Sequence, residues 1–125
     1  MVLKLETIII FVQNVDKLKK FYVDIFGFEI IEETPSQWLL LKAGNCNIGL
    51  HKISQEYLEE NQAAFKFDNN TKIVFETEDD IHTLRQELLS KDVKIKEIMT
   101  WENYDYWLCD GEDPEGNVFQ IKKKK

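Results

Sequence analysis

The 125-residue chain lacks several features that mark particular protein classes. Its longest apolar run, residues 7–12, has the length of a strand and is too short to span a membrane. The N-terminus shows no apolar segment followed by small residues, so we expect no secretory signal. The chain has two cysteines, Cys46 and Cys109, and no glycine-rich phosphate loop. These absences predict reduced, inert thiols in a cytoplasmic protein.

Positive charge is also scarce. The 16 lysines and arginines are outnumbered by 23 aspartates and glutamates, which gives a net charge of −7. Four of the lysines, residues 122–125, end the chain, so the body before them is more acidic still. Such a surface repels nucleic acid backbones, and we expect no nucleic acid partner. The simplest interpretation of the acidic surface is solubility.

One order of elements occupies the first half of the chain. Residues 3–12 are β-branched and apolar, which predicts a strand. Asn14 is placed to cap a helix, and Gly27 is placed to end it. Three further strands are predicted at residues 28–33, 37–42 and 46–52.

The same order returns after a polar connector, residues 54–70. A strand is predicted at residues 71–77 and a helix at residues 79–91. Three more strands are predicted at residues 93–99, 103–109 and 118–122. The order βαβββ therefore occurs twice, which predicts an α+β fold. We expect a single domain made of two modules, residues 1–53 and residues 71–125. Because one helix covers only one face of each sheet, we expect the other faces to curve around a cup.

Three sequence motifs occur in a defined order. Residues 12–28 contain a polar cap, a helix that ends in Phe-Tyr, and the exit Ile-Phe-Gly-Phe. Residues 75–81, Phe-Glu-Thr-Glu-Asp-Asp-Ile, begin the second module, and residues 113–117, Asp-Pro-Glu-Gly-Asn, form a turn before the last strand. Together they resemble the vicinal oxygen chelate superfamily, which includes glyoxalase I, extradiol dioxygenases and the fosfomycin- and bleomycin-resistance proteins. The resemblance implies the paired βαβββ fold and a homodimer.

The resemblance also implies where a metal ion would bind. Metalloenzymes of the family take His and Glu ligands from the first and last strands of each module. The corresponding positions here are Thr7, Asn47 or Gly49, Lys72 or Thr71, and Gln120. This set offers a hydroxyl, amides and an ammonium, but no imidazole or carboxylate, which are the groups that a divalent metal prefers. We therefore expect no metal and no cofactor.

His51 is the main alternative source of chemistry. In an alternating strand His51 shares a face with Asn47 and Gly49, and Glu76 shares a face with Lys72. A pair of His51 and Glu76 would suit metal binding or proton transfer. The simpler interpretation is a strand-end histidine in contact with solvent and a Glu76 that pairs with Lys72.

Aromatic residues concentrate near the penultimate predicted strand, at Trp101, Tyr104, Tyr106 and Trp107. Part of this set must build core, but aromatic walls with nearby carboxylates also suit a planar or cationic small molecule. We therefore predict a metal-free binding protein, similar to the family members that sequester antibiotics.

The residues predicted to line its cup are Thr7, His51, Trp101, Tyr104, Tyr106 and Gln120. The first alternative is a metal-dependent lyase, isomerase or dioxygenase with a degenerate site that uses His51 and Glu76. The second alternative is a structural or regulatory dimer with a filled cup.

Overall fold

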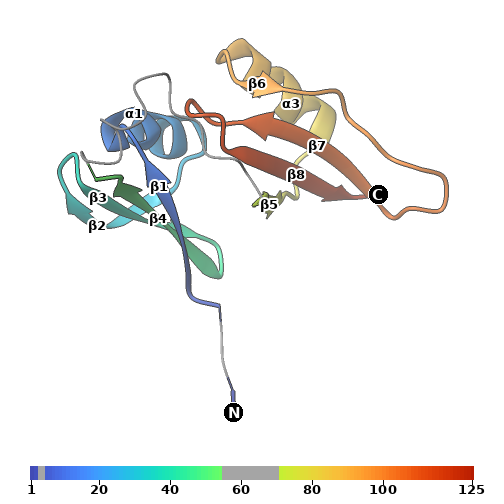
Figure 1. The fold of residues 1–125 in the computed structure, drawn as a ribbon. Helices are drawn as coiled ribbons and strands as arrows, with labels where there is room; N and C mark the ends of the chain where they lie inside the picture. The colour runs from blue at the N-terminus through green and yellow to red at the C-terminus, as the bar shows by residue number, and fades with distance from the viewer. Residues whose placement is uncertain (3–4, 55–70) are drawn as a thin grey trace. The chain divides into compact units, whose positions relative to one another are not determined.

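The computed structural model describes residues 1–2, 5–54 and 71–125 (Figure 1). The chain divides into two compact units, Met1–Phe65 and Lys66–Lys125, and the boundary lies inside the connector expected at residues 54–70. Residues 55–70 of this connector lie outside the described residues. Within the described residues, no helix combines the length and apolar character needed to cross a membrane.

The first unit is a four-stranded mixed sheet with the order β1-β4-β3-β2. Its strands are β1 (Thr7–Val12), β2 (Glu29–Thr34), β3 (Trp38–Ala43) and β4 (Cys46–Lys52). β1 runs parallel to β4, and the other two pairings are antiparallel. The strands predicted from the sequence are all present, and β4 has the predicted bounds.

The helix of the first unit differs in one respect from the single α-helix expected. α1 (Val15–Lys19) continues as the π-helical segment η1 (Lys20–Ile25). Its start is capped as predicted, because the Asn14 side chain accepts the Lys17 N–H at 3.0 Å. At the end of the π-helical segment η1 the Phe26 N–H donates to the Phe21 carbonyl oxygen, five residues earlier. Gly27 then ends the helix with a φ of 75°.

The second unit repeats this arrangement, with the sheet order β5-β8-β7-β6. Its elements are β5 (Ile73–Glu76), α3 (Ile81–Ser90), β6 (Lys94–Ile95), β7 (Tyr106–Glu112) and β8 (Val118–Lys124). β5 runs parallel to β8, and β7 lies antiparallel to both β6 and β8. The twofold βαβββ order predicted from the sequence is therefore confirmed, as two four-stranded mixed sheets that each carry one helical segment. A shared cup between the units stays a prediction.

Two strand predictions in the second unit are wrong in their bounds. The strand expected at residues 93–99 is limited to β6, followed by an isolated bridge between Met99 and Leu108. The strand expected at residues 103–109 begins three residues later, because Asn103 has a φ of 66° in the preceding turn. A left-handed residue interrupts the extended backbone, so the strand starts only beyond it.

The turn at residues 113–117 forms as the sequence predicts. The Asp113 carboxylate is buried and accepts the N–H groups of Glu115 and Asn117, both at 2.9 Å. Its second oxygen accepts the Asn117 side-chain amide at 2.7 Å. Gly116 supplies the positive φ that the turn requires, at 80°. The turn fixes the start of β8 and therefore the register of Gln120.

Candidate functional site

Each sheet has one face under its helix and one open face. In the first unit the helix side holds the buried side chains Leu39, Leu41, Ile48 and Leu50. The open face of the first sheet includes the alternate residues Thr7, Ile9, Phe11, Trp38, Asn47, Gly49 and His51. The expected alternation in β4, with Asn47, Gly49 and His51 on one face, is confirmed.

The indole of Trp38 lies across Gly49 on this open face. A Cβ atom on Gly49 would lie 2.4 Å from Trp38 Cη2 and 2.8 Å from Trp38 Cζ3, so only glycine leaves room for the ring. The indole Nε1–H donates to Glu32 Oε1 at 3.1 Å and fixes the orientation of the ring. The Trp38 ring therefore covers Gly49, which is one of the two β4 positions that the family resemblance assigns to a metal ligand.

The other β4 position, Asn47, is paired in register with Thr7 on β1. Asn47 Nδ2–H donates to Glu6 Oε1 at 3.1 Å, and the Thr7 hydroxyl donates to the second Glu6 oxygen. Glu6, which directly precedes β1, was not among the residues predicted for the site. Thr7 and Asn47 thus share one exposed carboxylate, and a single exposed carboxylate with amide and hydroxyl neighbours is a weak metal site.

His51 lies away from this pair. It lies four positions after Asn47, or about 13 Å along a strand. The ring Nδ1 lies 2.8 Å from the Lys52 carbonyl oxygen, and the ring centroid lies 5.3 Å from that of Phe11 and 6.0 Å from that of Trp38. His51 therefore belongs to an exposed aromatic cluster. Glu76 lies on β5 in the second unit, and its pairing with His51 stays a prediction.

The open face of the second sheet carries a charged cluster of Lys72, Asp110 and Gln120. Lys72 Nζ lies 2.8 Å from Asp110 Oδ2, and Gln120 Nε2–H donates to Asp110 Oδ1 at 2.8 Å. The register of β7 with β8 places Asp110 opposite Gln120, which explains the contact. The interpretation that paired Lys72 with Glu76 is wrong, because Lys72 binds the carboxylate from β7 instead.

The charge state of this cluster is well defined. Partial burial raises the pKa of Asp110, but the hydrogen bonds from Lys72 and Gln120 and the charges of Lys72 and Lys96 outweigh burial. The net result is a pKa below the ordinary value for aspartate. At neutral pH the cluster therefore holds an ammonium against a carboxylate.

These residues do not fit a divalent metal ion. The cluster has one carboxylate, already bound to an ammonium that repels cations, and one amide whose N–H points at that carboxylate. In the part of the chain that the structure describes, no group of three or more His, Cys, Asp or Glu side chains is placed to hold a metal. The chemistry that the site offers is hydrogen bonding, ion pairing and aromatic contact.

Three of the four predicted aromatic residues of the second unit form a row at one end of β7, whereas Trp107 contacts His82 of α3. Ring centroids lie 5.4 Å apart for Trp101 and Tyr104, and 5.8 Å apart for Tyr104 and Tyr106. Trp101 and Tyr104 are exposed in the turn before the strand. Lys122 Nζ lies 3.9 Å from the Tyr106 ring centroid, so a cation from the chain itself already contacts this ring.

Comparison with known proteins places these features in a family context. The sequence model of the Glyoxalase/Bleomycin resistance protein/Dioxygenase superfamily matches residues 4–121. The structure is similar to that of a lactoylglutathione lyase from Agrobacterium tumefaciens, at 17% identity and a TM-score of 0.72, over 96% of this chain and 92% of that chain. It is also similar to the fosfomycin resistance protein FosX from Listeria monocytogenes, at 14% identity and a TM-score of 0.78, over 100% and 96%. No curated protein sequence matches the chain. At these identities the structural likeness shows the fold alone.

Proposed function

We propose that this chain, which belongs to the Glyoxalase/Bleomycin resistance protein/Dioxygenase superfamily, binds a small molecule without a metal ion and without converting it. The observation that carries the proposal is the contact of the Lys72 ammonium with Asp110, which Gln120 also holds. The family resemblance places metal ligands at Lys72 or Thr71 and at Gln120. Here Lys72 carries a positive charge, and Gln120 donates a hydrogen bond to its counter-ion, Asp110.

A metal ion added to this cluster would find no net attraction. A divalent cation about 4 Å from an ammonium is repelled by about 8 kcal/mol at an effective dielectric constant of about 20, and the Asp110 carboxylate at a similar distance attracts it by about the same amount. The amide oxygen of Gln120 binds a hard cation too weakly to hold it without further carboxylates. The cluster therefore favours a metal-free role.

The open face of the first sheet supports the binding of a planar, apolar or cationic ligand. Ile9 and Phe11 are 49% and 50% exposed there, beside the rings of Trp38 and His51. The Glu32 carboxylate lies at the edge of the indole and offers a partner for a cationic group. The remaining predicted ligand contacts, at Thr7, Trp101, Tyr104, Tyr106 and Gln120, belong to the same proposal.

The proposal extends to a cytoplasmic homodimer. Two free thiols suit a reducing compartment. All six residues of the edge strand β2 are exposed, with Ile30 and Ile31 among three glutamates, and the unpaired backbone groups of this edge suit contact with a second copy. Sedimentation equilibrium of the full chain measures the mass directly, and a monomer at all concentrations would contradict the dimer.

A fluorescence titration tests ligand binding. A panel of N-methylquinolinium, quinoline and naphthoate at neutral pH compares a permanently cationic, a neutral and an anionic aromatic probe. We expect N-methylquinolinium to bind most tightly, and we expect Phe11→Ala and Trp38→Phe each to weaken binding about three- to tenfold. Leu89→Ala removes a comparably exposed apolar side chain from α3 and should leave binding unchanged. An absence of saturable binding across the panel would contradict the proposal.

A further inference from the structure

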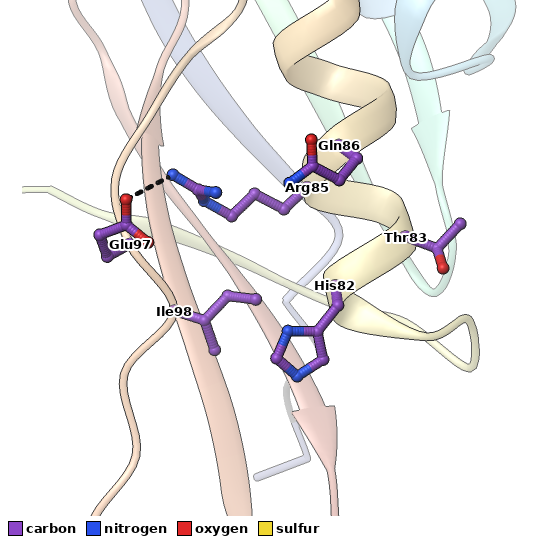
Figure 2. Close-up of a pocket in the computed structure, with 6 residues that line it drawn as sticks. All are labelled: His82, Thr83, Arg85, Gln86, Glu97 and Ile98. Atoms are coloured by element: carbon purple, nitrogen blue, oxygen red, sulfur yellow. Dashed lines mark hydrogen bonds and ion pairs between the residues drawn. The ribbon is translucent and has the colours of Figure 1, made fainter.

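A cavity lies on the helix-covered side of the second sheet, away from the open face that carries Asp110 and Gln120. Its volume is about 460 Å³. Figure 2 shows the six residues that line this helix-side pocket, which are His82, Thr83, Arg85, Gln86, Glu97 and Ile98. Four of them come from α3, and two come from the segment that follows β6.

Arg85 is the organising residue of the helix-side pocket. Its side chain is only 14% exposed, and its Nε–H donates to the Lys96 carbonyl oxygen at 2.8 Å. This bond fixes the plane of the guanidinium group, so its terminal nitrogens are held in place before any ligand arrives. Figure 2 shows the side chain reaching from α3 across to Glu97.

The Arg85 guanidinium is paired with Glu97, and this ion pair is weak. Arg85 Nη2 lies 3.0 Å from Glu97 Oε1, but the Glu97 side chain is 88% exposed. An ion pair with such an exposed partner contributes little stability and exchanges readily with water. An incoming anion can therefore take the place of Glu97 without loss of a buried contact.

The rest of the pocket complements an oxyanion with a small apolar part. The His82 ring is held against Trp107, with centroids 5.7 Å apart, and the amide of Gln86 follows one helical turn later. Ile98 lies beside the His82 ring and gives the pocket one apolar wall (Figure 2). The cavity volume is in the range of small-molecule sites.

We propose that the helix-side pocket binds a small oxyanion, a carboxylate or a phosphate, with Arg85 as its principal partner. A planar guanidinium can donate two parallel N–H hydrogen bonds to such a group. Glu97 now accepts a hydrogen bond from only one nitrogen of Arg85, Nη2. The net charge of −7 opposes anions at long range, but salt screens it beyond about 8 Å at physiological ionic strength. This proposal does not depend on the metal-free function of the open face.

An NMR titration of the full chain tests the proposal, with sodium phosphate and sodium succinate as probes at constant ionic strength. The Arg85 Nε–H signal and the His82 backbone amide should shift saturably. Arg85→Gln should abolish the shift of the His82 amide, whereas Glu97→Gln removes the competitor and should tighten binding by up to about fivefold. Lys91→Gln, a matched loss of one positive charge just beyond the end of α3, should change the affinity less than about twofold.

The outcome also identifies the anion. Tighter binding of phosphate assigns the pocket to phosphate groups, and tighter binding of succinate assigns it to carboxylates. No saturable shift with either probe, or equal effects of Arg85→Gln and Lys91→Gln, would overturn the proposal. If Arg85→Gln does not fold, Arg85→Lys replaces it, because it keeps the charge and loses the paired donors, and unchanged affinity in that variant would also overturn the proposal.

Discussion

The Lys72 ammonium and the Asp110 carboxylate lie 2.8 Å apart on the open face of the second sheet, and Gln120 holds the other oxygen of that carboxylate at the same distance. The family resemblance implies metal ligands at Lys72 or its neighbour Thr71 and at Gln120. The pair therefore gives the open face a neutral, hydrogen-bonded centre in place of a cation-binding one, and it links the stability of the second unit to the charge of Asp110.

Asp110→Asn is expected to lower the free energy of unfolding by about 1 kcal/mol at pH 7, because it removes the counter-ion of Lys72. The pKa of Asp110 is lowered in the folded chain, so its charge stabilises the fold above the unfolded value of about 3.9. That contribution is lost as the pH falls through the folded pKa. Urea unfolding at pH 7 and pH 3 measures the difference between wild type and variant.

A matched control for this prediction is Glu87→Gln, which breaks the exposed pair with Lys91. We expect that change to alter the free energy of unfolding by less than about 0.5 kcal/mol. A wild-type advantage over Asp110→Asn that is as large at pH 3 as at pH 7 would show that the ion pair is not its source.

Gly49→Ala should displace the Trp38 indole, because the new Cβ would lie 2.4 Å from its ring. We expect a loss of about 1–3 kcal/mol of stability and a changed tryptophan fluorescence spectrum. The cost should largely disappear when Trp38→Leu is already present, and a double-mutant cycle measures this coupling. Additive effects of the two changes would mean that the ring does not depend on the glycine.

The two cysteines should differ in reactivity. Burial raises the pKa of the Cys109 thiol, which is fully buried and donates to the Lys96 carbonyl at 3.2 Å, whereas Cys46 is partly exposed. A disulfide reagent should therefore modify one thiol in the native chain and a second only after unfolding. In Cys46→Ser the fast reaction should vanish, and its persistence would contradict the inert state assigned to Cys109.

Asp113→Ala should cost about 2–3 kcal/mol of stability, because three hydrogen bonds end on this buried carboxylate. Asp113→Asn should cost less, since one oxygen remains to accept the two backbone N–H groups. Thermal unfolding of both variants measures the order. An asparagine variant as unstable as the alanine variant would assign the effect to the lost charge alone.

Local patterns in the sequence were sufficient to predict the order of the helices and strands. β4 has the predicted bounds because apolar alternation and turn residues mark both ends of it, and the cap at Asn14 and the turn at Asp113 follow from side-chain chemistry within a few residues. The start of β7 was misplaced because Asn103 takes a positive φ, which residue type permits without requiring it.

The contacts of the site were harder to predict, because they join residues far apart in the chain. Lys72 and Asp110 are 38 positions apart, and their contact depends on the register of β5, β8 and β7. The position of the Trp38 ring over Gly49 likewise depends on the pairing of β3 with β4. Sequence patterns showed that metal ligands were missing from these positions, but not what replaced them.

Calorimetric titration of chelator-treated protein with Zn²⁺, Ni²⁺, Mn²⁺ and Fe²⁺ tests the central claim most directly. The double variant Lys72→His with Gln120→Glu places an imidazole and a second carboxylate beside Asp110, and it serves as the positive control. We predict no saturable binding to the wild-type chain and measurable binding to the double variant. Saturable binding of one metal ion per wild-type chain would contradict the metal-free account.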